Sequence, residues 1–377
     1  MTRKSAAARE NRSSSGPVSG AATPAGTRRF ADRFTTAFAA DFYRRTPEGL
    51  TLSSIGMGTY LGECDDEEDR RYVDVLTAGV SSGLNVLDTA INYRCQRSER
   101  AVGRALRKIF DSSIARRDEI VVCTKGGYVP LEGSPPESRS DYEAYLEREY
   151  FSSSVMSKSD IVAGGHCVTP RFLSDQIERS RANLGVDHID VFYLHNPEQQ
   201  LDSLDRARFT RSLTDAFSEL ESQVDAGHIG AYGCATWNGF RSPPTSKNHL
   251  SLSSLVQIAN GVGGKSHHFR FVQLPVNLAM TEAVRATTQE SGGAPMSLLD
   301  AATELGVSVV ASATLMQSQL TKDLPAAVRA LFPDVETDAQ RAIAFVRSLP
   351  VSTALVGMRS HAHLEENIGA GTTVIRA

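Results

Sequence analysis

The stretch VLDTAINYRCQRS, residues Val86 to Ser98, decides the fold and carries the first sign of chemistry. A short apolar run ends in Asp88, and Tyr93 follows five residues later in a polar loop. A carboxylate at the carboxyl end of a buried strand is costly unless a cation or a hydrogen-bond donor pairs with it. We therefore expect the rest of the chain to supply a cation for Asp88 and a polar partner for Tyr93.

Apolar runs of this kind recur from Leu50 onward and alternate with amphipathic stretches. The runs are apolar throughout, which is typical of parallel strands covered on both faces. The predicted strands are Ile55–Gly58, Val86–Thr89, Ile120–Lys125, Ile189–His195, Ile229–Ala235, Phe271–Asn277, Val307–Ala313 and Ala354–Met358. The predicted helices are Glu67–Ser81, Ser98–Phe110, Pro170–Leu184, Ser203–Ala226, Ser246–Ala259, Met296–Glu304 and Asp338–Ser348.

Eight strand–helix units predict an α/β fold, a closed (β/α)8 TIM barrel that forms a single domain over residues 34–377. An open six-stranded sheet with a cap domain is the structural alternative. Residues 1–33 are rich in Ser, Ala, Gly and Arg and contain only two acids, Glu10 and Asp32. Such a segment predicts a disordered N-terminal tail, and its composition also fits an organelle transit peptide.

Composition narrows the class of protein. The chain of 377 residues has a formal net charge of -4, which argues against a nucleic-acid partner. Its five cysteines are scattered without a CxxC pair, so we expect a reducing, cytoplasmic compartment and no metal cluster. No apolar run approaches the roughly 20 residues that cross a bilayer, so we expect a soluble protein without a membrane partner.

One long segment, Gly126 to Thr169, interrupts the repeating units after the third predicted strand. Segments of this length inside a compact domain are usually functional or mobile. In a barrel this one would rise from the catalytic end, where it could cover a substrate, or it could be a surface addition.

The carboxyl ends of barrel strands bring side chains from distant parts of the chain together. Asp88, Lys125 and His195 end three successive predicted strands, and Tyr93 lies in the loop after Asp88. Lys125 would satisfy the buried carboxylate of Asp88 and would lower the pKa of Tyr93 below about 10, so that the phenol protonates an oxygen. A neutral His195 would hold a substrate carbonyl. Because no side chain delivers hydride, a nicotinamide cofactor is implied.

The chain resembles the aldo-keto reductases from Leu50 to Ile368. The resemblance rests on six motifs in order: GMGTY (Gly56–Tyr60), LDTAINY (Leu87–Tyr93), CTKGG (Cys123–Gly127), DVFYLHNPE (Asp190–Glu198), VQLPVNL (Val272–Leu278) and GMRSHAHLEENI (Gly357–Ile368). It implies reversible, NADPH-dependent reduction of an aldehyde or ketone to an alcohol, with Asp88, Tyr93, Lys125 and His195 as the catalytic tetrad and Tyr93 as the proton donor. It also implies a hairpin, within Phe42 to Ser53, that closes the bottom of the barrel.

The same resemblance implies a cofactor site, for which NADPH is favoured over NADH, across the barrel mouth. The phosphates of the cofactor would lie at the start of the helix after Met358, where free backbone N–H groups favour an anion. Arg359 would pair with one of these phosphates. The cofactor-binding residues are Gly58, Thr59, Tyr60, Asp88, Thr236, Gln273, Ser312, Leu315, Gly357, Met358, Arg359, Ser360, Glu366 and Asn367. The substrate would meet Tyr60, Tyr128, His195 and Trp237, a partly aromatic set.

Two positions depart from the family pattern. The usual Ser-Asn pair at the end of the fifth strand is Ala235 and Thr236 here, and the tyrosine that usually faces the nicotinamide is replaced by Ser312 and Ala313. The alternative function is an NAD(P)-binding regulatory or partner protein on the same barrel with little turnover. A metal-dependent hydrolase that uses Asp88 and His195 is disfavoured, because no HxH pair or additional strand-end carboxylate is present.

Three further features carry no function. ANGVGGKS (Ala259–Ser266) looks like a phosphate-binding loop, but it precedes a strand and has Ala259 at its first glycine position. The acidic run Cys64–Arg71 opens a predicted helix, where acids complement the dipole. His166 and Cys167 lie in the long segment, and no chemistry is assigned to them.

Overall fold

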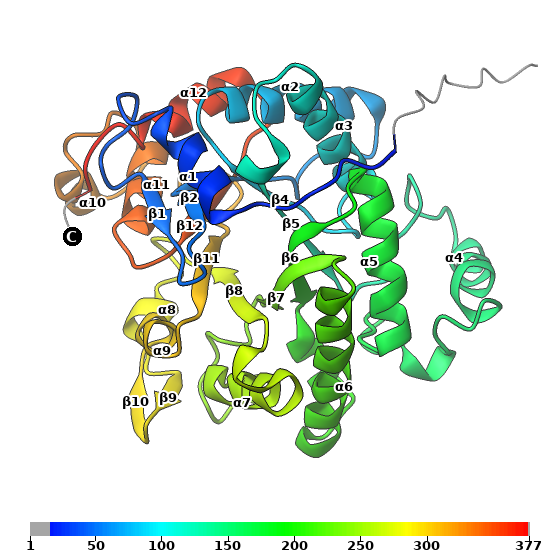
Figure 1. The fold of residues 1–377 in the computed structure, drawn as a ribbon. Coiled ribbons are helices and arrows are strands. Elements are labelled where there is room, and N and C mark those ends of the chain that lie inside the picture. The colour runs from blue at the N-terminus through cyan, green and yellow to red at the C-terminus, as the bar shows by residue number, and fades with distance from the viewer. Residues whose placement is uncertain (1–15, 376–377) are drawn as a thin grey trace, which may run out of the picture.

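The computed structural model of the chain describes residues 16–375, in which eight parallel strands close into a barrel ringed by helices (Figure 1). The barrel strands are β3 (Ile55–Gly58), β4 (Val86–Asp88), β5 (Val121–Gly126), β6 (Ile189–His195), β7 (Ile229–Ala235), β8 (Phe269–Pro275), β11 (Ser308–Ser312) and β12 (Thr353–Gly357). They follow chain order around the barrel, and the last strand, β12, pairs with the first, β3, to close it. The predicted (β/α)8 barrel is confirmed, and the open-sheet alternative is wrong.

The helices are α1 (Pro24–Asp32), α2 (Asp66–Ser81), α3 (Arg97–Asp111), α4 (Arg139–Leu146), α5 (Pro170–Leu184), α6 (Arg206–Asp225), α7 (Leu252–Gly263), α8 (Glu282–Arg285), α9 (Leu298–Glu304), α10 (Ala326–Leu331), α11 (Asp338–Arg347) and α12 (His361–Gly369). Most predicted helices are confirmed within a few residues. The largest shift is in α7, which begins at Leu252 rather than Ser246 because the Ser251 hydroxyl caps it by accepting from the Ser254 N–H.

A short antiparallel hairpin, β1 (Tyr43–Arg45) and β2 (Thr51–Ser53), covers the amino end of the barrel as predicted. Leu52 of this hairpin is 2% exposed and packs among the side chains inside the barrel. A second hairpin, β9 (Gln289–Ser291) and β10 (Ala294–Met296), lies outside the barrel. The amino end is therefore closed, and chemistry is confined to the other end.

The period of two along each strand determines which side chains face inward. Val121 and Cys123 of β5 pack in the barrel interior, whereas Val122 packs outward against the helices. In β6, Val191 and Tyr193 face inward in the same way. Two residues further along each strand, the same alternation brings inward-facing polar residues to the open end of the barrel. These are Asp88, Lys125, His195 and Gln273.

The N-terminal prediction needs correction for the residues that the structure describes. Residues 16–33 are ordered, and α1 packs against the barrel with Phe30 fully buried. Its arginines meet acids of the 3-10 turn Arg117–Glu119: Arg29 pairs with Asp118 at 2.7 Å and with Glu119 at 2.9 Å. The composition concealed this helix because its basic residues find partners far away in the sequence. Residues 1–15, which carry the rest of the predicted tail and transit signal, lie outside the described residues.

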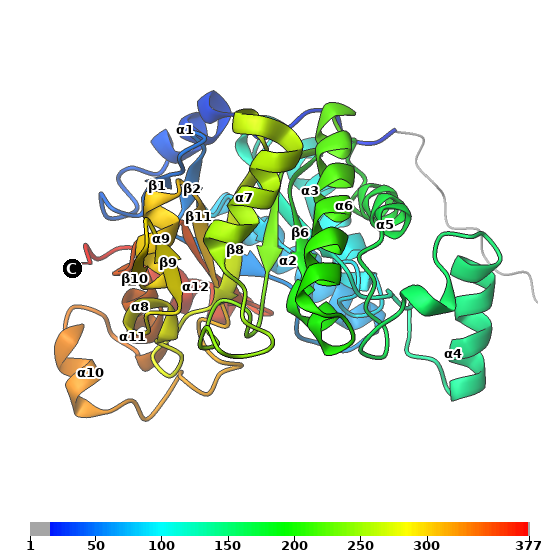
Figure 2. The same cartoon turned by 90° about the horizontal axis from the view of Figure 1, so that it is seen from below.

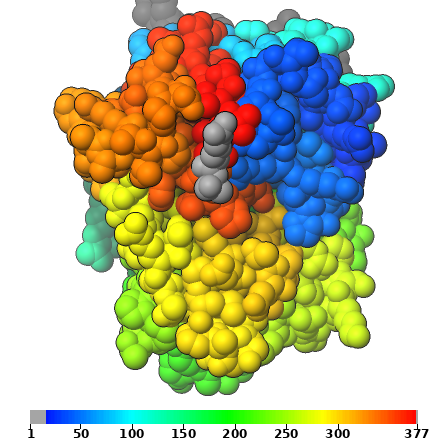
Figure 3. Space-filling view, turned by 90° about the vertical axis from the view of Figure 1, so that its left-hand side faces the viewer, coloured from blue at the N-terminus to red at the C-terminus, as the bar shows by residue number. Residues whose placement is uncertain are grey.

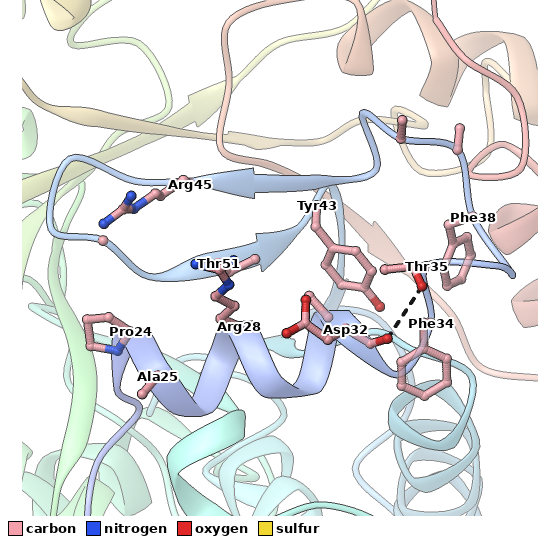
Figure 4. A pocket seen from close by; sticks show the side chains of 14 residues that line it. Pro24, Ala25, Arg28, Asp32, Phe34, Thr35, Phe38, Tyr43, Arg45 and Thr51 are labelled. Atoms are coloured by element: carbon pink, nitrogen blue, oxygen red, sulfur yellow. Dashed lines mark hydrogen bonds between the residues drawn. The ribbon is translucent and has the colours of Figure 1, made fainter.

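The N-terminal and C-terminal segments lie side by side on one face of the molecule (Figure 3). The N–H of Ala39 donates to the carbonyl of Gly371 at 3.0 Å. Beside them, α1 and the β1–β2 hairpin flank a cavity of about 720 Å³, with Pro24 and Arg45 toward one end, Phe34, Phe38 and Tyr43 toward the other, and Arg28 between the helix and the hairpin (Figure 4). None of the strand-end polar residues lines this cavity.

The long segment between β5 and α5 folds as a separate small unit. It contains α4 and a π-helical turn over Glu147–Phe151, and it has its own apolar cluster around Tyr150. Figure 2 shows α4 projecting sideways from the barrel. Of residues 126–169, only Tyr128 lines the pocket at the open end. Most of the segment is therefore a lateral addition, and only its base reaches the mouth.

The docking of α1 can be tested with two helix glycines. A Cβ on Gly26 would lie 2.0 Å from the backbone oxygen of Asp118, so Gly26→Ala must displace α1. We expect the free energy of unfolding to fall by about 1–3 kcal/mol, as for other overpacked sites. Gly261→Ala in α7 is the matched control, because nothing lies within 4 Å of its Cβ. It should raise stability by about 0.5–1 kcal/mol. Equal effects in urea unfolding would contradict the packing of α1.

Candidate active site

The centre of the open end is a buried ion pair. The Lys125 Nζ on β5 lies 2.5 Å from Asp88 Oδ1 on β4, and the two side chains are 1% and 5% exposed. The Nζ also donates to the carbonyl of Thr89 at 2.8 Å, and Gln273 on β8 donates to Asp88 Oδ2 at 2.8 Å. Burial is the largest single influence and lowers the pKa of Lys125, but the charge of Asp88, the neighbouring Tyr93 and the hydrogen bond to Asp88 together raise it, so the ammonium is retained.

Tyr93 and His195 lie directly above this ion pair. The Lys125 Nζ is 5.0 Å from the centroid of the Tyr93 ring. The Tyr93 ring meets His195 edge-on at 5.8 Å and Tyr60 at 5.0 Å between centroids. The structure therefore brings Tyr93 together with the three strand-end residues that the sequence singled out.

The pKa expected for Tyr93 is wrong in direction. Burial raises the pKa of Tyr93 from its ordinary value, and the charge of Lys125 only partly opposes this shift. The expectation counted the cation but not the loss of water around the ring. The consequence is that Tyr93 is a neutral phenol at pH 7, the form that holds a proton to give.

His195 is a neutral imidazole, as expected. Burial lowers its pKa well below the ordinary value, and the charge of Lys125 adds to that shift. Its Nδ1 is buried and has no hydrogen-bond partner among the described residues. The Nε2 is therefore the ring nitrogen available to a substrate.

A second histidine, His166, supports His195 from behind, and the sequence did not reveal this role. Its Nε2 lies 2.7 Å from the backbone oxygen of His195, and its Nδ1 accepts from the Gln200 amide at 2.7 Å. Because Nδ1 accepts, Nε2 carries the proton. A Cβ on Gly127 would lie 3.0 Å from both His166 Nε2 and the His195 oxygen, so this contact requires glycine there. Only the fold of the long segment brings His166 to the strand end.

We define the mouth pocket as the cavity of about 560 Å³ at the open end. All four predicted substrate residues line it, as do nine of the predicted cofactor residues. It is lined by Gly58, Thr59, Tyr60, Leu61, Asp88, Asn92, Tyr93, Tyr128, His195, Asn196, Ala235, Thr236, Trp237, Gln273, Met280, the run from Ser312 to Gln319, Leu355 and Gly357. It therefore extends from Tyr93 and His195 toward the ends of β11 and β12.

The other five predicted cofactor residues lie beyond the lining of the mouth pocket, on and before α12. Met358 is 1% exposed and Asn367 is 2% exposed, and the Ser360 hydroxyl caps α12 by accepting from the N–H of His363. Glu366 is half-buried on the same helix. The Arg359 guanidinium is 3.4 Å from Glu68 Oε1, a buried carboxylate at the start of α2.

The pocket suits a cofactor that offers an amide. The Thr236 Oγ1 is buried without a hydrogen-bond partner among the described residues, and it lies on the pocket wall beside Gln273. A buried hydroxyl without a partner is costly unless a ligand completes it. Among residues 16–375, the Gln273 side-chain amide makes one hydrogen bond, to Asp88. Thr236 and Gln273 could therefore hold a carboxamide despite the absence of the usual Ser-Asn pair.

Sequence reasoning missed several pocket residues. Asn196 follows His195 in a left-handed conformation (φ 50°), and its amide donates to the Tyr128 hydroxyl at 2.8 Å. Its position after a strand-end histidine was a usable signal. The loop after β11 supplies a run of lining residues with positive φ at Ala313, Met316, Gln317 and Ser318. Nothing in its composition marks that conformation, because none of these residues is glycine.

Residues 16–375 contain neither a metal centre built from His, Cys, Asp or Glu side chains nor a helix that could span a membrane. No group of three or more His, Cys, Asp or Glu side chains there could hold a metal ion. No helix of that range is both long and apolar enough to cross a membrane.

Comparison with protein families matches residues 54–243 to the model described as "Aldo/keto reductase family". An NADH-specific methylglyoxal reductase of Escherichia coli is 28% identical over 152 residues, which are 39% of each chain. A D-threo-aldose 1-dehydrogenase of a Pseudomonas species is 29% identical over 191 residues, 49% of this chain and 50% of the relative. The matched part of the chain thus spans half or less of the length of these curated relatives.

Solved structures extend the likeness in fold to most of the chain. A Klebsiella pneumoniae aldo/keto reductase in complex with NADP and acetate has a TM-score of 0.59 at 19% identity, covering 89% of this chain and 91% of the other. A thermostable aldo-keto reductase in complex with the inhibitor epalrestat has a TM-score of 0.59 at 16% identity, covering 89% and 95%.

The support that His166 gives to His195 predicts a loss of stability on substitution. His166→Leu leaves a buried carbonyl and the Gln200 amide without their partner, so we expect the free energy of unfolding to fall by about 1–3 kcal/mol at pH 7.5. His188→Leu is the matched control, because His188 also contacts a carbonyl, that of Gly227, but at the surface. It should change stability by less than about 0.5 kcal/mol.

The burial of His166 also predicts how the free energy of unfolding depends on pH, and the same variant tests this. Burial lowers the pKa of His166 to about 4, whereas an unfolded histidine titrates near 6.5. Between these values the unfolded chain binds a proton that the folded chain does not, so stability falls as the pH falls through this window. From pH 7.5 to pH 5, urea unfolding should show the parent losing about 2 kcal/mol more than His166→Leu. If the free energies of unfolding of the parent and of His166→Leu changed equally with pH, the lowered pKa of His166 would not be the cause.

Proposed function

Because the chain belongs to the aldo/keto reductase family, we propose that it reduces the carbonyl of a small aldehyde or ketone to an alcohol at the expense of NADPH, and catalyses the reverse oxidation. The observation that carries this proposal is the buried Lys125–Asp88 pair, at 2.5 Å, directly beneath Tyr93 and His195. The two relatives are named as a reductase and a dehydrogenase, which agrees with carbonyl–alcohol chemistry in both directions.

The roles of the four residues follow from their charges. His195, neutral and with Nε2 available, donates to the carbonyl oxygen of the substrate and orients it. Tyr93, protonated at neutral pH, gives its proton to that oxygen as negative charge develops there. The Lys125 ammonium stabilises the phenolate that remains, and Asp88 fixes the ammonium in place. When bound, a reduced nicotinamide supplies the hydride that reaches the carbonyl carbon.

The residues that would hold this cofactor fall into two groups. Thr236 and Gln273 would bind the carboxamide, with Gly58, Thr59, Tyr60, Ser312, Leu315 and Gly357 around the ring and its ribose. Met358, Arg359, Ser360, Glu366 and Asn367 would serve the phosphates and the adenine. The five cysteines are unpaired, which fits a reducing compartment such as the cytoplasm.

The proton donor is tested by Tyr93→Phe. Loss of general acid catalysis should lower carbonyl-dependent NADPH oxidation by about 10²–10⁴-fold, whereas binding of NADPH, followed by protein fluorescence, should persist. Tyr142→Phe, on the laterally projecting α4, is the control and should keep full activity. A Tyr93→Phe variant with parental activity would overturn the mechanism. Tight NADPH binding with no turnover across a broad panel of aldehydes and ketones would overturn the proposed activity itself.

The preference for NADPH is tested at Glu68. Its carboxylate faces Arg359, the cation expected to meet a 2′-phosphate, so Glu68→Gln should free the guanidinium and strengthen NADPH binding several-fold relative to NADH. Glu67→Gln is the matched control, because Glu67 is exposed and pairs with Arg71 instead. The ratio of the two dissociation constants is the readout. An unchanged ratio in Glu68→Gln would show that Arg359 does not contact the 2′-phosphate.

A further inference from the structure

Two cysteines meet between the loops that carry Tyr60 and Tyr93, although 30 residues separate them in the sequence. Cys64 lies in the loop between β3 and α2, and Cys95 lies in the turn that follows Tyr93. Their Sγ atoms are 3.8 Å apart. Both thiols are free.

The contact between the two loops is held by the residue next to Cys95. The Arg94 side chain is 1% exposed, and it donates to the carbonyls of Glu63 at 2.7 Å and Asp65 at 3.3 Å. These are the residues on either side of Cys64. Arg94 also pairs with Asp69 in the first turn of α2 at 2.6 Å. The backbone around Cys64 is therefore attached to the turn that carries Cys95, and the two sulfurs face each other as a consequence.

The turn itself has an unusual conformation. Arg94, Cys95 and Gln96 have φ values of 48°, 54° and 70°, a run of three left-handed residues without glycine. Such residues persist only where their surroundings hold them. Here the Cys95 carbonyl accepts from the N–H of Gly133 at 3.0 Å, and the Gln96 amide donates to the Leu131 carbonyl at 3.0 Å. The thiol of Cys95 is thus presented to Cys64 from a fixed backbone.

From this geometry we infer that Cys64 and Cys95 are a site of reversible disulfide formation, with a hydroperoxide such as hydrogen peroxide as the oxidant. Cys64 is half-buried and is the sulfur that an oxidant can reach, whereas Cys95 is 6% exposed. Burial, together with the neighbouring Cys64, raises the pKa of Cys95 to about 12, so Cys95 remains a thiol until Cys64 has reacted.

The chemistry balances without any other group of the protein. The Cys64 thiolate attacks one peroxide oxygen and the O–O bond breaks. Hydroxide departs, and Cys64 becomes a sulfenic acid. The Cys95 sulfur then attacks the Cys64 sulfur, the S–O bond breaks, and the oxygen leaves as water with the Cys95 proton. In total, two thiols and one hydrogen peroxide give one disulfide and two waters. Dithiothreitol reverses the reaction and is itself oxidised to a cyclic disulfide.

The bond would alter the wall of the mouth pocket. Sulfur atoms in a disulfide are about 2.0 Å apart, so the two Sγ atoms must approach by about 1.8 Å, the difference from 3.8 Å. Tyr60 lies four residues before Cys64, and Tyr93 lies two residues before Cys95. Their rings are in contact at 5.0 Å between centroids. Oxidation should therefore shift Tyr93 and lower turnover, and this consequence, unlike the bond itself, rests on the proposed function.

The test uses the full chain treated with stoichiometric hydrogen peroxide. The intact mass should fall by that of two hydrogens, and trypsin without reductant should release peptide 46–70 linked to peptide 95–97. Dithiothreitol should restore the mass. Oxidation should raise the melting temperature by a few degrees, because the bond closes a loop in the unfolded chain. The same sample should lose carbonyl-dependent NADPH oxidation at least threefold and regain it on reduction.

Three variants keep the outcomes separable. Cys64→Ser and Cys95→Ser should form no link and should resist the loss of turnover, whereas Cys123→Ala, at a buried cysteine inside the barrel, should form the link like the parent. Over-oxidation of Cys64 without a linked peptide, or a link to any other cysteine, would overturn the inference. A protein that forms the link but shows no turnover in either state would leave the disulfide standing and overturn the proposed function alone.

Discussion

The structure of the open end depends on one buried ion pair. Two charges withdrawn from water are stable only if their geometry is good and further hydrogen bonds reach both of them. Lys125 and Asp88 meet that condition with Thr89 from the adjoining turn and with Gln273 from the far side of the barrel. Asp88, Lys125 and Gln273 belong to β4, β5 and β8, so the hydrogen bonds cross the barrel interior. Barrel closure is thus a requirement for burying the charge, and the charge in turn fixes the relative positions of three strands.

Around this pair, burial determines which groups are charged. Tyr93 and His195 lie in the same environment as Lys125, yet only the lysine has a carboxylate at contact distance. Burial therefore keeps the phenol protonated and the imidazole neutral, while Lys125 keeps its charge because Asp88 is present. One cation below two neutral hydrogen-bond donors is the arrangement that proton transfer to a carbonyl oxygen needs. The same residues with Asp88 further from Lys125 would not provide it.

Much of this arrangement could be predicted from the sequence, because it depends on strand periodicity. A period of two and a common strand direction suffice to bring Asp88, Lys125 and His195 to one end, and each predicted strand lies within a few residues of the observed one. The pKa of Tyr93 could not be predicted in this way, since its direction depends on how much water the folded site excludes. The role of His166 was also hidden, because it depends on where a 44-residue insertion returns to the barrel.

Two regions whose attachment to the barrel the sequence did not reveal share a physical cause. Residues 16–33 and the segment between β5 and α5 have polar compositions that indicate little burial. Polar contacts attach both to the barrel: α1 through pairs between Arg29 and the acids at 118 and 119, and the long segment, which also has its own apolar cluster around Tyr150, through the contact of His166 with His195. Amphipathic periodicity reports contacts within an element, whereas these contacts join elements more than 25 residues apart. A polar segment beside a barrel can therefore be ordered whenever the barrel presents the complementary charge or carbonyl, and in the case of His166 that order extends to the candidate active site.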